Sequence, residues 1–271
     1  MAPLLSRLGL GRSGFGFGKR TVSSGATGSY TGSAFPIMNT SDALGQTLSS
    51  GTRTDTNSAS IVFALPMNGA NNGTTFTDQS ATIKGSGSAK TFTISGDTKT
   101  VTSQSKFYGS SGYFDGTGDY LTSSSTGTDM TVGSGAFTIE FWVNFNSFSG
   151  TPIVVSAGTG GFSVGVNGSG NVFMYRNGPG GWGESWTTTA LSTGQWYHIV
   201  TQTSSGSGGV WTSYINGVSQ STKSGWSGEG GTSPLYIGGY GNGVGSQLPN
   251  AYIQDIRIYK GVAKYTSDFT P

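Results

Sequence analysis

The sequence predicts an all-β protein, built as a sandwich or barrel of short antiparallel strands. Glycine occupies 48 of the 271 positions, more than twice its average usage of about 7%, and it disfavours helix nearly everywhere. From Ile61 onward, short apolar runs alternate with turns rich in glycine and asparagine. Aromatic residues make up 12% of the chain, so enough apolar surface is present to build a core.

The clearest strand is 137–145, FTIEFWVNF. Every second residue from Phe137 to Phe145 is apolar, which predicts a strand with one face in the core. Asn216-Gly217 predicts a two-residue type I′ hairpin turn, because both turn positions take positive φ. Further strands are expected at 61–65, 91–94, 162–166, 172–175, 196–201, 210–215, 235–237 and 251–259.

The first sixty residues differ from the rest and predict an extended arm. Residues 1–60 are rich in Gly, Ser and Thr and show no strand periodicity. An arm of this composition has too little apolar surface to become ordered alone. We therefore expect it to dock onto a partner protein; the alternative is an arm folded back on its own domain. The expected docking residues are Arg7, Arg12, Phe15, Phe17, Lys19 and Arg20.

Charge and cysteine content exclude several classes of function. Only 10% of residues are charged and the net charge is +2, so neither nucleic acid nor a membrane surface is an expected partner. The chain has no cysteine, hence no disulfide, thiolate metal site or cysteine nucleophile. The apolar patch at the start is interrupted by Arg7, and it is too short for a signal peptide.

Six motifs follow one another in the order typical of one domain family. They are 113–121 (YFDGTGDYL), 137–143 (FTIEFWV), 195–199 (QWYHI), 214–217 (YING), 235–238 (LYIG) and 252–259 (YIQDIRIY). In this order they resemble laminin G-like domains of the concanavalin A-like type. The resemblance implies a two-sheet antiparallel jelly-roll sandwich, which we expect over residues 61–271.

The flanking segments are similar to those of laminin G-like proteins of tailed bacteriophages, including cyanophages. The segments are 67–69, 75–78, 105–107 and 259–271. This likeness implies a virion accessory protein that docks by its arm and decorates or cements a capsid or tail. Its partners would be other virion proteins and copies of itself. It would be made in the host cytoplasm and reside in the extracellular particle.

The sequence favours a non-enzymatic role, with a β-glucanase-like hydrolase as a remote alternative. Glucanases of this fold resemble one another in a Glu-x-Asp-x-Glu strand that supplies acid, base and nucleophile. Here Glu140 stands alone in its strand. His198 is the only histidine and has no serine elbow nearby, so a Ser-His-Asp triad is not expected; we expect a half-buried strand residue instead.

The resemblance also implies that a calcium ion is possible, because laminin G-like domains often hold one through Asp, Asn and backbone oxygens. The candidate ligands are Asp115, Asp119 and Asp255. Each has an equally good explanation as a turn cap or as a hydrogen-bonded strand end.

The alternative function that the sequence suggests is a tail or fibre adhesion protein that binds a host glycan. Tryptophans in two glycine-rich segments could stack on a sugar, with carboxylates nearby for its hydroxyl groups. The same tryptophans could equally anchor an interface with a neighbouring subunit, and the sequence leaves both interpretations open. The residues concerned are Trp182, Glu184, Trp186, Trp226 and Glu229.

Overall fold

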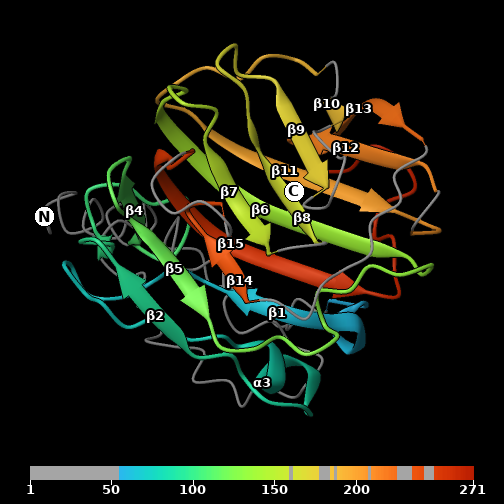
Figure 1. The fold of residues 1–271 in the computed structure, drawn as a ribbon, viewed down its shortest axis with the longest axis horizontal. Helices are drawn as coiled ribbons and strands as arrows, with labels where there is room; N and C mark the ends of the chain where they lie inside the picture. The colour runs from blue at the N-terminus through green and yellow to red at the C-terminus, as the bar shows by residue number, and fades with distance from the viewer. Residues whose placement is uncertain are drawn as a thin grey trace, which may run out of the picture.

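The computed structural model describes residues 55–158, 161–176, 184–185, 188–206, 209–224, 234–240 and 247–271. In this part of the chain two antiparallel sheets pack face to face, with sheet 2 in front of sheet 1 in Figure 1. The strands of sheet 1 are β1 (Ile61–Leu65), β3 (Lys99–Val101), β4 (Ser111–Asp115), β6 (Phe137–Ser147), β11 (Trp196–Thr203), β12 (Trp211–Ile215), β13 (Val218–Lys223) and β15 (Asn250–Lys260). The strands of sheet 2 are β2 (Phe92–Ser95), β5 (Tyr120–Ser123), β7 (Ile153–Ala157), β8 (Phe162–Val166), β9 (Val172–Arg176), β10 (Glu184–Ser185) and β14 (Leu235–Ile237).

The sheet order places segments far apart in the sequence side by side. Sheet 1 runs β13-β12-β11-β6-β15-β4-β3, and sheet 2 runs β10-β9-β8-β7-β14-β5-β2. Strand β15 pairs with β6 along one edge, while its other edge pairs first with β4 and then with β1. The ladder with β6 is irregular between Gln254 and Arg257, and Asp255 there has φ of 55°.

The core lies between the sheets, where the inward side chains of both interdigitate. Phe137 of β6 packs on Phe162 of β8 with ring centroids 5.7 Å apart, and both rings are fully buried. Such inter-sheet contacts between large apolar side chains supply most of the stabilisation of a sandwich. The predicted all-β sandwich is therefore confirmed.

Every predicted strand is present, and the hairpin turn has the predicted conformation. Asn216 and Gly217 have φ of 50° and 79°, as a type I′ turn requires. Sequence patterns did not predict β3, β4, β5, β7 or β10, none of which is longer than five residues. They also missed the five-residue helix α3 (Ser80–Lys84), which Gly85 ends with φ of 75°, and the 3-10 turn η1 (Ser58–Ser60). No helix among the described residues is long and apolar enough to span a membrane.

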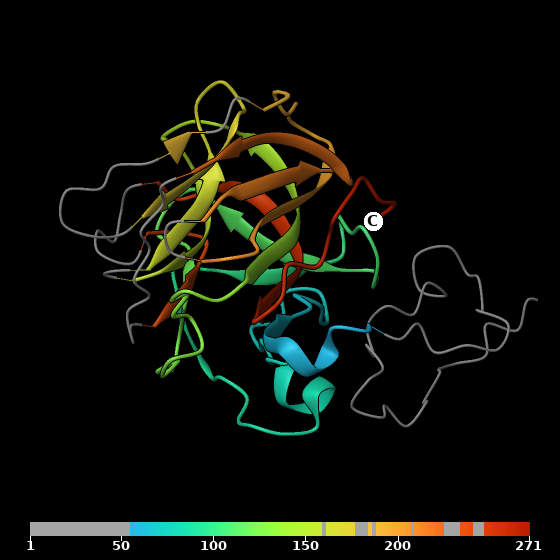
Figure 2. The same cartoon turned by 90° about the vertical axis from the view of Figure 1, so that its right-hand side faces the viewer.

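One expectation about β6 needs correction, because both of its faces are buried. Glu140, Trp142 and Asn144, which alternate with the core residues, are only 2%, 7% and 3% exposed. The C-terminal segment 262–269 runs along the outer side of sheet 1 (Figure 2). The ring of Phe107 also covers Trp142, with centroids 5.2 Å apart. Glu140 and Trp142 are thus buried by segments outside the sheet, whereas Asn144 lies in register between Tyr252 and Trp196 of the neighbouring strands.

Candidate functional site

The outer face of sheet 1 brings together the polar and aromatic side chains that alternate with the core residues. The C-terminal segment covers one part of this face and leaves another part uncovered. We call the part beneath residues 262–269 the covered half, and the part around Tyr113, Tyr252, Asn144 and Trp196 the open half. The two halves have different chemistry.

Glu140 is the centre of the covered half. The Lys264 ammonium lies 2.7 Å from its Oε1 atom, and the Tyr265 hydroxyl donates to its Oε2 atom at 2.6 Å. Arg257 lies 4.0 Å from Oε1. Both carboxylate oxygens are therefore engaged, as a buried charge requires.

The ionisation of this half follows from burial and from the cations around it. Burial alone would raise the pKa of Glu140, but the positive charges of Lys264 and Arg257 outweigh it and hold the pKa at about 2. Burial lowers the pKa of His198 to about 4 despite the nearby Glu140 carboxylate. His198 is thus neutral at pH 7, and at 5% exposure it is buried rather than half-buried as expected.

The C-terminal segment is fixed to the face by hydrogen bonds and rings. Gln202 donates to the Tyr265 carbonyl oxygen at 2.5 Å and accepts from the Tyr265 N–H at 3.1 Å. The Tyr265 and Phe269 rings stack with centroids 3.6 Å apart, and the Phe269 ring contacts His198 edge-on. The Phe269 N–H donates to the Gly217 carbonyl oxygen at 3.0 Å, which ties the segment to the β12–β13 turn.

The open half presents a row of side chains across four neighbouring strands. Tyr113 of β4 lies opposite Tyr252 of β15, Tyr252 lies opposite Asn144 of β6, and Asn144 lies opposite Trp196 of β11. The two tyrosine rings stack, with centroids 5.0 Å apart and an interplanar angle of 30°. Tyr113, Tyr252 and Trp196 are partly exposed. The row therefore offers aromatic rings to solvent, with the buried amide of Asn144 between them.

Two polar atoms in this row have no partner among the described residues. They are the Oδ1 atom of Asn144 and the Nε1 atom of Trp196, both enclosed by protein. Beside the row, the amide of Asn146 donates to Oδ1 of Asn250 at 2.7 Å. The unpaired acceptor and the unpaired donor lie on adjacent strands in direct register.

Two of the three calcium candidates meet in the structure, together with an acid that sequence reasoning missed. Carboxylate oxygens of Asp97, Asp115 and Asp119 lie within 4.8 Å of one another, an oxygen set of the kind that calcium uses. Both Asp119 oxygens already accept backbone N–H groups, from Asp97 at 2.8 Å and Asp115 at 3.0 Å. These bonds give Asp119 a structural role in joining two loops, and a bound ion stays a prediction.

The third candidate, Asp255, lies elsewhere. Its carboxylate accepts from Arg257 through Nε at 2.9 Å and Nη2 at 2.5 Å. Both residues are buried on β15, so Asp255 balances a buried guanidinium and is not part of the Asp97–Asp115–Asp119 cluster.

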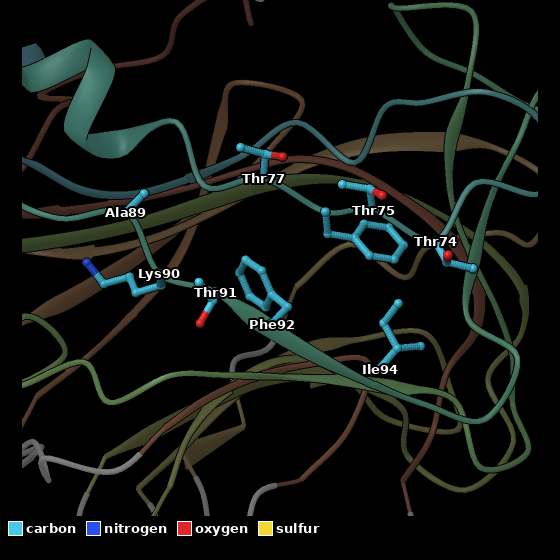
Figure 3. A pocket seen from close by; sticks show the side chains of 9 residues that line it. Thr74, Thr75, Thr77, Ala89, Lys90, Thr91, Phe92 and Ile94 are labelled. Atoms are coloured by element: carbon cyan, nitrogen blue, oxygen red, sulfur yellow. The ribbon is translucent and has the colours of Figure 1, made fainter.

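A groove of about 360 Å³ opens beside the edge strand β2, between that strand and residues 74–77. Phe92 and Ile94 project from β2 toward it (Figure 3). The ammonium of Lys90, which also lines the groove, is bound to the Val62 carbonyl oxygen and to Asp129, both at 2.7 Å. The groove therefore offers mainly apolar and hydroxyl groups.

Most of the binding residues predicted from sequence lie outside the described residues. This holds for Trp182, Trp186, Trp226 and Glu229, and for the whole set of arm residues between Arg7 and Arg20. For Glu184 only the backbone is described, in β10. The row on the open half was missed, although Tyr113, Trp196 and Tyr252 stand in the quoted motifs, because sequence alone does not reveal which strands pair.

Comparison with known proteins gives the family. Residues 115–264, more than half of the chain, match the family model described as the concanavalin A-like lectin/glucanases superfamily. No curated protein matches the chain significantly in sequence.

Solved structures show the same fold in bacterial toxins. The binding domain of Paraclostridial mosquitocidal protein 1 superposes with a TM-score of 0.58 at 16% identity, covering 76% of this chain and 50% of that one. A structure of botulinum neurotoxin type C, whose cell entry depends on two ganglioside molecules, superposes with a TM-score of 0.54 at 14% identity, covering 77% of this chain and 50% of that one. The binding domain of botulinum neurotoxin DC in complex with SialylT superposes with a TM-score of 0.55 at 14% identity and the same coverage of both chains. The chain thus spans about half the length of these structures, and at these identities the likeness shows the fold.

Proposed function

The chain belongs to the concanavalin A-like lectin/glucanases superfamily, and from this premise we propose that it is a carbohydrate-binding domain without hydrolytic activity. Of the two functions that the sequence suggests, glycan binding has more support than virion docking. Its support comes from the fold, which the glycan-linked toxin structures share, and from the chemistry of the outer face of sheet 1.

The observation that carries the proposal is the open half of that face. Tyr113, Tyr252 and Trp196 are large aromatic side chains that remain partly exposed on a rigid sheet. Aromatic rings with an amide between them are what a saccharide-binding surface requires, because a sugar stacks its C–H groups on rings and directs its hydroxyl groups to polar atoms. Rings held on a sheet also lose little conformational freedom on binding.

The covered half supports the absence of hydrolysis. Glycoside hydrolysis uses two carboxyl groups flanking the scissile bond, one of them free to give or take a proton. Glu140 is held ionised by Lys264 and is covered by the C-terminal segment. The nearby Asp255 is bound to Arg257. The third acid, Asp55, accepts from the Tyr259 hydroxyl and lies 3.7 Å from the Lys264 ammonium. Each of these three acids is engaged by a neighbouring group, which argues against a free acid pair.

A glycan array with the purified full chain, followed by calorimetry on any hit, tests the proposal. Binding to at least one glycan, together with no release of reducing ends from laminarin or related β-glucans, is expected. Hydrolysis that disappears in Glu140→Gln would overturn the non-enzymatic part. Silence across the array would overturn the binding part.

The virion context remains a prediction from the resemblance of the flanking segments to phage proteins. The arm expected to dock the domain, with Arg7, Arg12, Phe15, Phe17, Lys19 and Arg20, lies outside the described residues. The two functions are compatible, since a domain docked by its arm would leave its sheet face free for a host glycan.

A further inference from the structure

The open half of the outer face of sheet 1 contains a donor and an acceptor that no described group satisfies. Asn144 Oδ1 and Trp196 Nε1 are both enclosed and unpaired. Their residues face each other directly across β6 and β11, where opposing Cβ atoms lie about 4.5–5.5 Å apart. Leaving buried polar groups unpaired opposes folding, so two of them side by side call for a physical explanation.

Aromatic rings continue the row on the other side of Asn144. Tyr252 lies opposite Asn144, and Tyr113 lies opposite Tyr252 and stacks on it. At the usual spacing of neighbouring strands, the four positions from Tyr113 to Trp196 span about 14 Å. The row is thus long and narrow, and it runs across the strands.

The row carries no charge of its own. Lys99, opposite Tyr113 on β3, is bound to Asp97 at 2.7 Å, and the carboxylates of Asp115 and Asp119 also act on Tyr113. The charges near the Tyr113 end are therefore mainly negative and disfavour an anionic sugar. A ligand for this row must offer apolar patches for the rings and a group that can both donate and accept a hydrogen bond. A hydroxyl group is such a group, and a pyranose combines it with an apolar C–H face.

We infer that this row is a binding site for a short neutral oligosaccharide that lies across β4, β15, β6 and β11, with one hydroxyl group bridging Trp196 Nε1 and Asn144 Oδ1. The inference deepens the proposed function and rests on it. The sugar reaches the two enclosed atoms by a rotamer change of the partly exposed Tyr252 or Trp196 ring, of a kind that is common at binding surfaces.

A buried water molecule is the competing occupant, because it would satisfy the same two atoms. The two explanations differ in what the atoms are for. If a water is a structural bridge, removing either polar atom destabilises the fold. If the atoms serve a ligand, replacing them by apolar groups of similar shape leaves stability unchanged or raises it, while sugar binding falls.

The test is calorimetry and thermal unfolding of the full chain with four variants, using neutral tetrasaccharides (cellotetraose, laminaritetraose, oligo-N-acetyllactosamine) and sialyllactose as the charged comparator. Trp196→Phe and Asn144→Leu remove the polar atoms, and Tyr252→Ala removes a ring. Tyr236→Ala on β14 is the matched control, since Tyr236 is a partly exposed tyrosine of sheet 2.

We expect a neutral oligosaccharide to bind, and Tyr252→Ala to weaken its binding about tenfold or more. Asn144→Leu, which preserves the side-chain shape, should weaken binding severalfold at unchanged or raised Tm. Trp196→Phe should also weaken binding severalfold. Tyr236→Ala should bind like the wild type. A glycan that binds equally well to all four variants would overturn the site but leave the proposed function standing. Binding of sialyllactose alone would overturn the neutral class, and a lowered Tm of Asn144→Leu would assign the pair to a structural water. If no glycan binds the wild type, the proposed function fails and this site fails with it.

Discussion

Burial destabilises the charged form of the Glu140 carboxylate, and its ion pairs stabilise that form. Lys264→Met removes the ammonium that lies 2.7 Å away and leaves a buried charge with weaker compensation. We expect this change to lower the free energy of unfolding by about 3 kcal/mol, as is usual when one partner of a buried pair is removed. Urea unfolding followed by tryptophan fluorescence measures it.

The matched control is the double variant Glu140→Gln with Lys264→Met, in which both charges are gone. It should recover at least half of the loss, because a pair of neutral groups is often as stable as a buried ion pair. If the change in the free energy of unfolding of the double variant equals the sum of the changes of the two single variants, the two residues do not interact energetically, contrary to the geometry.

His198 predicts a pH dependence of stability. Its pKa is about 4 in the folded protein against an ordinary value of 6.5, so the unfolded chain binds more protons between these values. Stability is complete above about pH 6.5 and falls as the pH is lowered toward 4, by up to about 3 kcal/mol. His198→Phe should flatten this part of the profile, measured by urea unfolding from pH 7 to pH 4. A loss of stability toward pH 4 that persists unchanged in the variant would point to another titrating group.

Glu140 makes a separate contribution at lower pH. Its pKa is about 2 in the folded protein against an ordinary value of 4.5, so stability falls further as the pH is lowered from 4.5 toward 2.

Among the elements, the β12–β13 hairpin and the C-terminal segment depend on each other. Gly217 has φ of 79°, and a Cβ atom there would lie 1.9 Å from the Phe269 carbonyl oxygen. Gly217→Ala should therefore cost backbone strain of about 1–2 kcal/mol and also displace the segment. Gly194→Ala is the matched control, because Gly194 has φ of 76° but open space around it.

The difference between the two alanine variants measures the contact with Phe269. We expect a lower Tm for Gly217→Ala than for Gly194→Ala, and faster proteolysis of the C-terminal segment only in the former. Equal effects on both would show that the segment does not rest on this turn.

Strands in which apolar and other residues alternate clearly were predictable from sequence, but the pairing of strands within the sheets was not. The alternation from Phe137 to Phe145 identified β6 and its core face, since every inward residue is apolar. The burial of Glu140 and Trp142 on the other face was not predictable, because the residues that cover them come from the far C-terminus and from the 105–107 loop. In the same way, no local pattern brings Tyr113, Asn144, Trp196 and Tyr252 together; only strand register does.

For the whole molecule, one sheet face combines two roles. Its covered half contains the charged groups and is closed by the chain's own C-terminal segment, which adds stability at the cost of access. Its open half keeps three aromatic rings partly exposed and the amide of Asn144 buried among them. Among the described residues of this face no acid pair is free, which agrees with the proposed binding of a sugar without hydrolysis. In this proposal the arm outside the sandwich selects the partner onto which the domain docks.

If the arm docks the protein and the sandwich binds the glycan, two N-terminal deletions should have different outcomes. Removing residues 1–54 should leave Tm and glycan binding unchanged while abolishing incorporation into particles, if the arm docks the domain as its composition predicts. Removing residues 1–55 also deletes Asp55, whose carboxylate accepts from the Tyr259 hydroxyl at 2.5 Å and lies 3.7 Å from the Lys264 ammonium. The longer deletion should lower Tm by several degrees, as expected for the loss of about 1–2 kcal/mol. Incorporation that survives the shorter deletion would show that the sandwich itself, and not the arm, carries the docking surface.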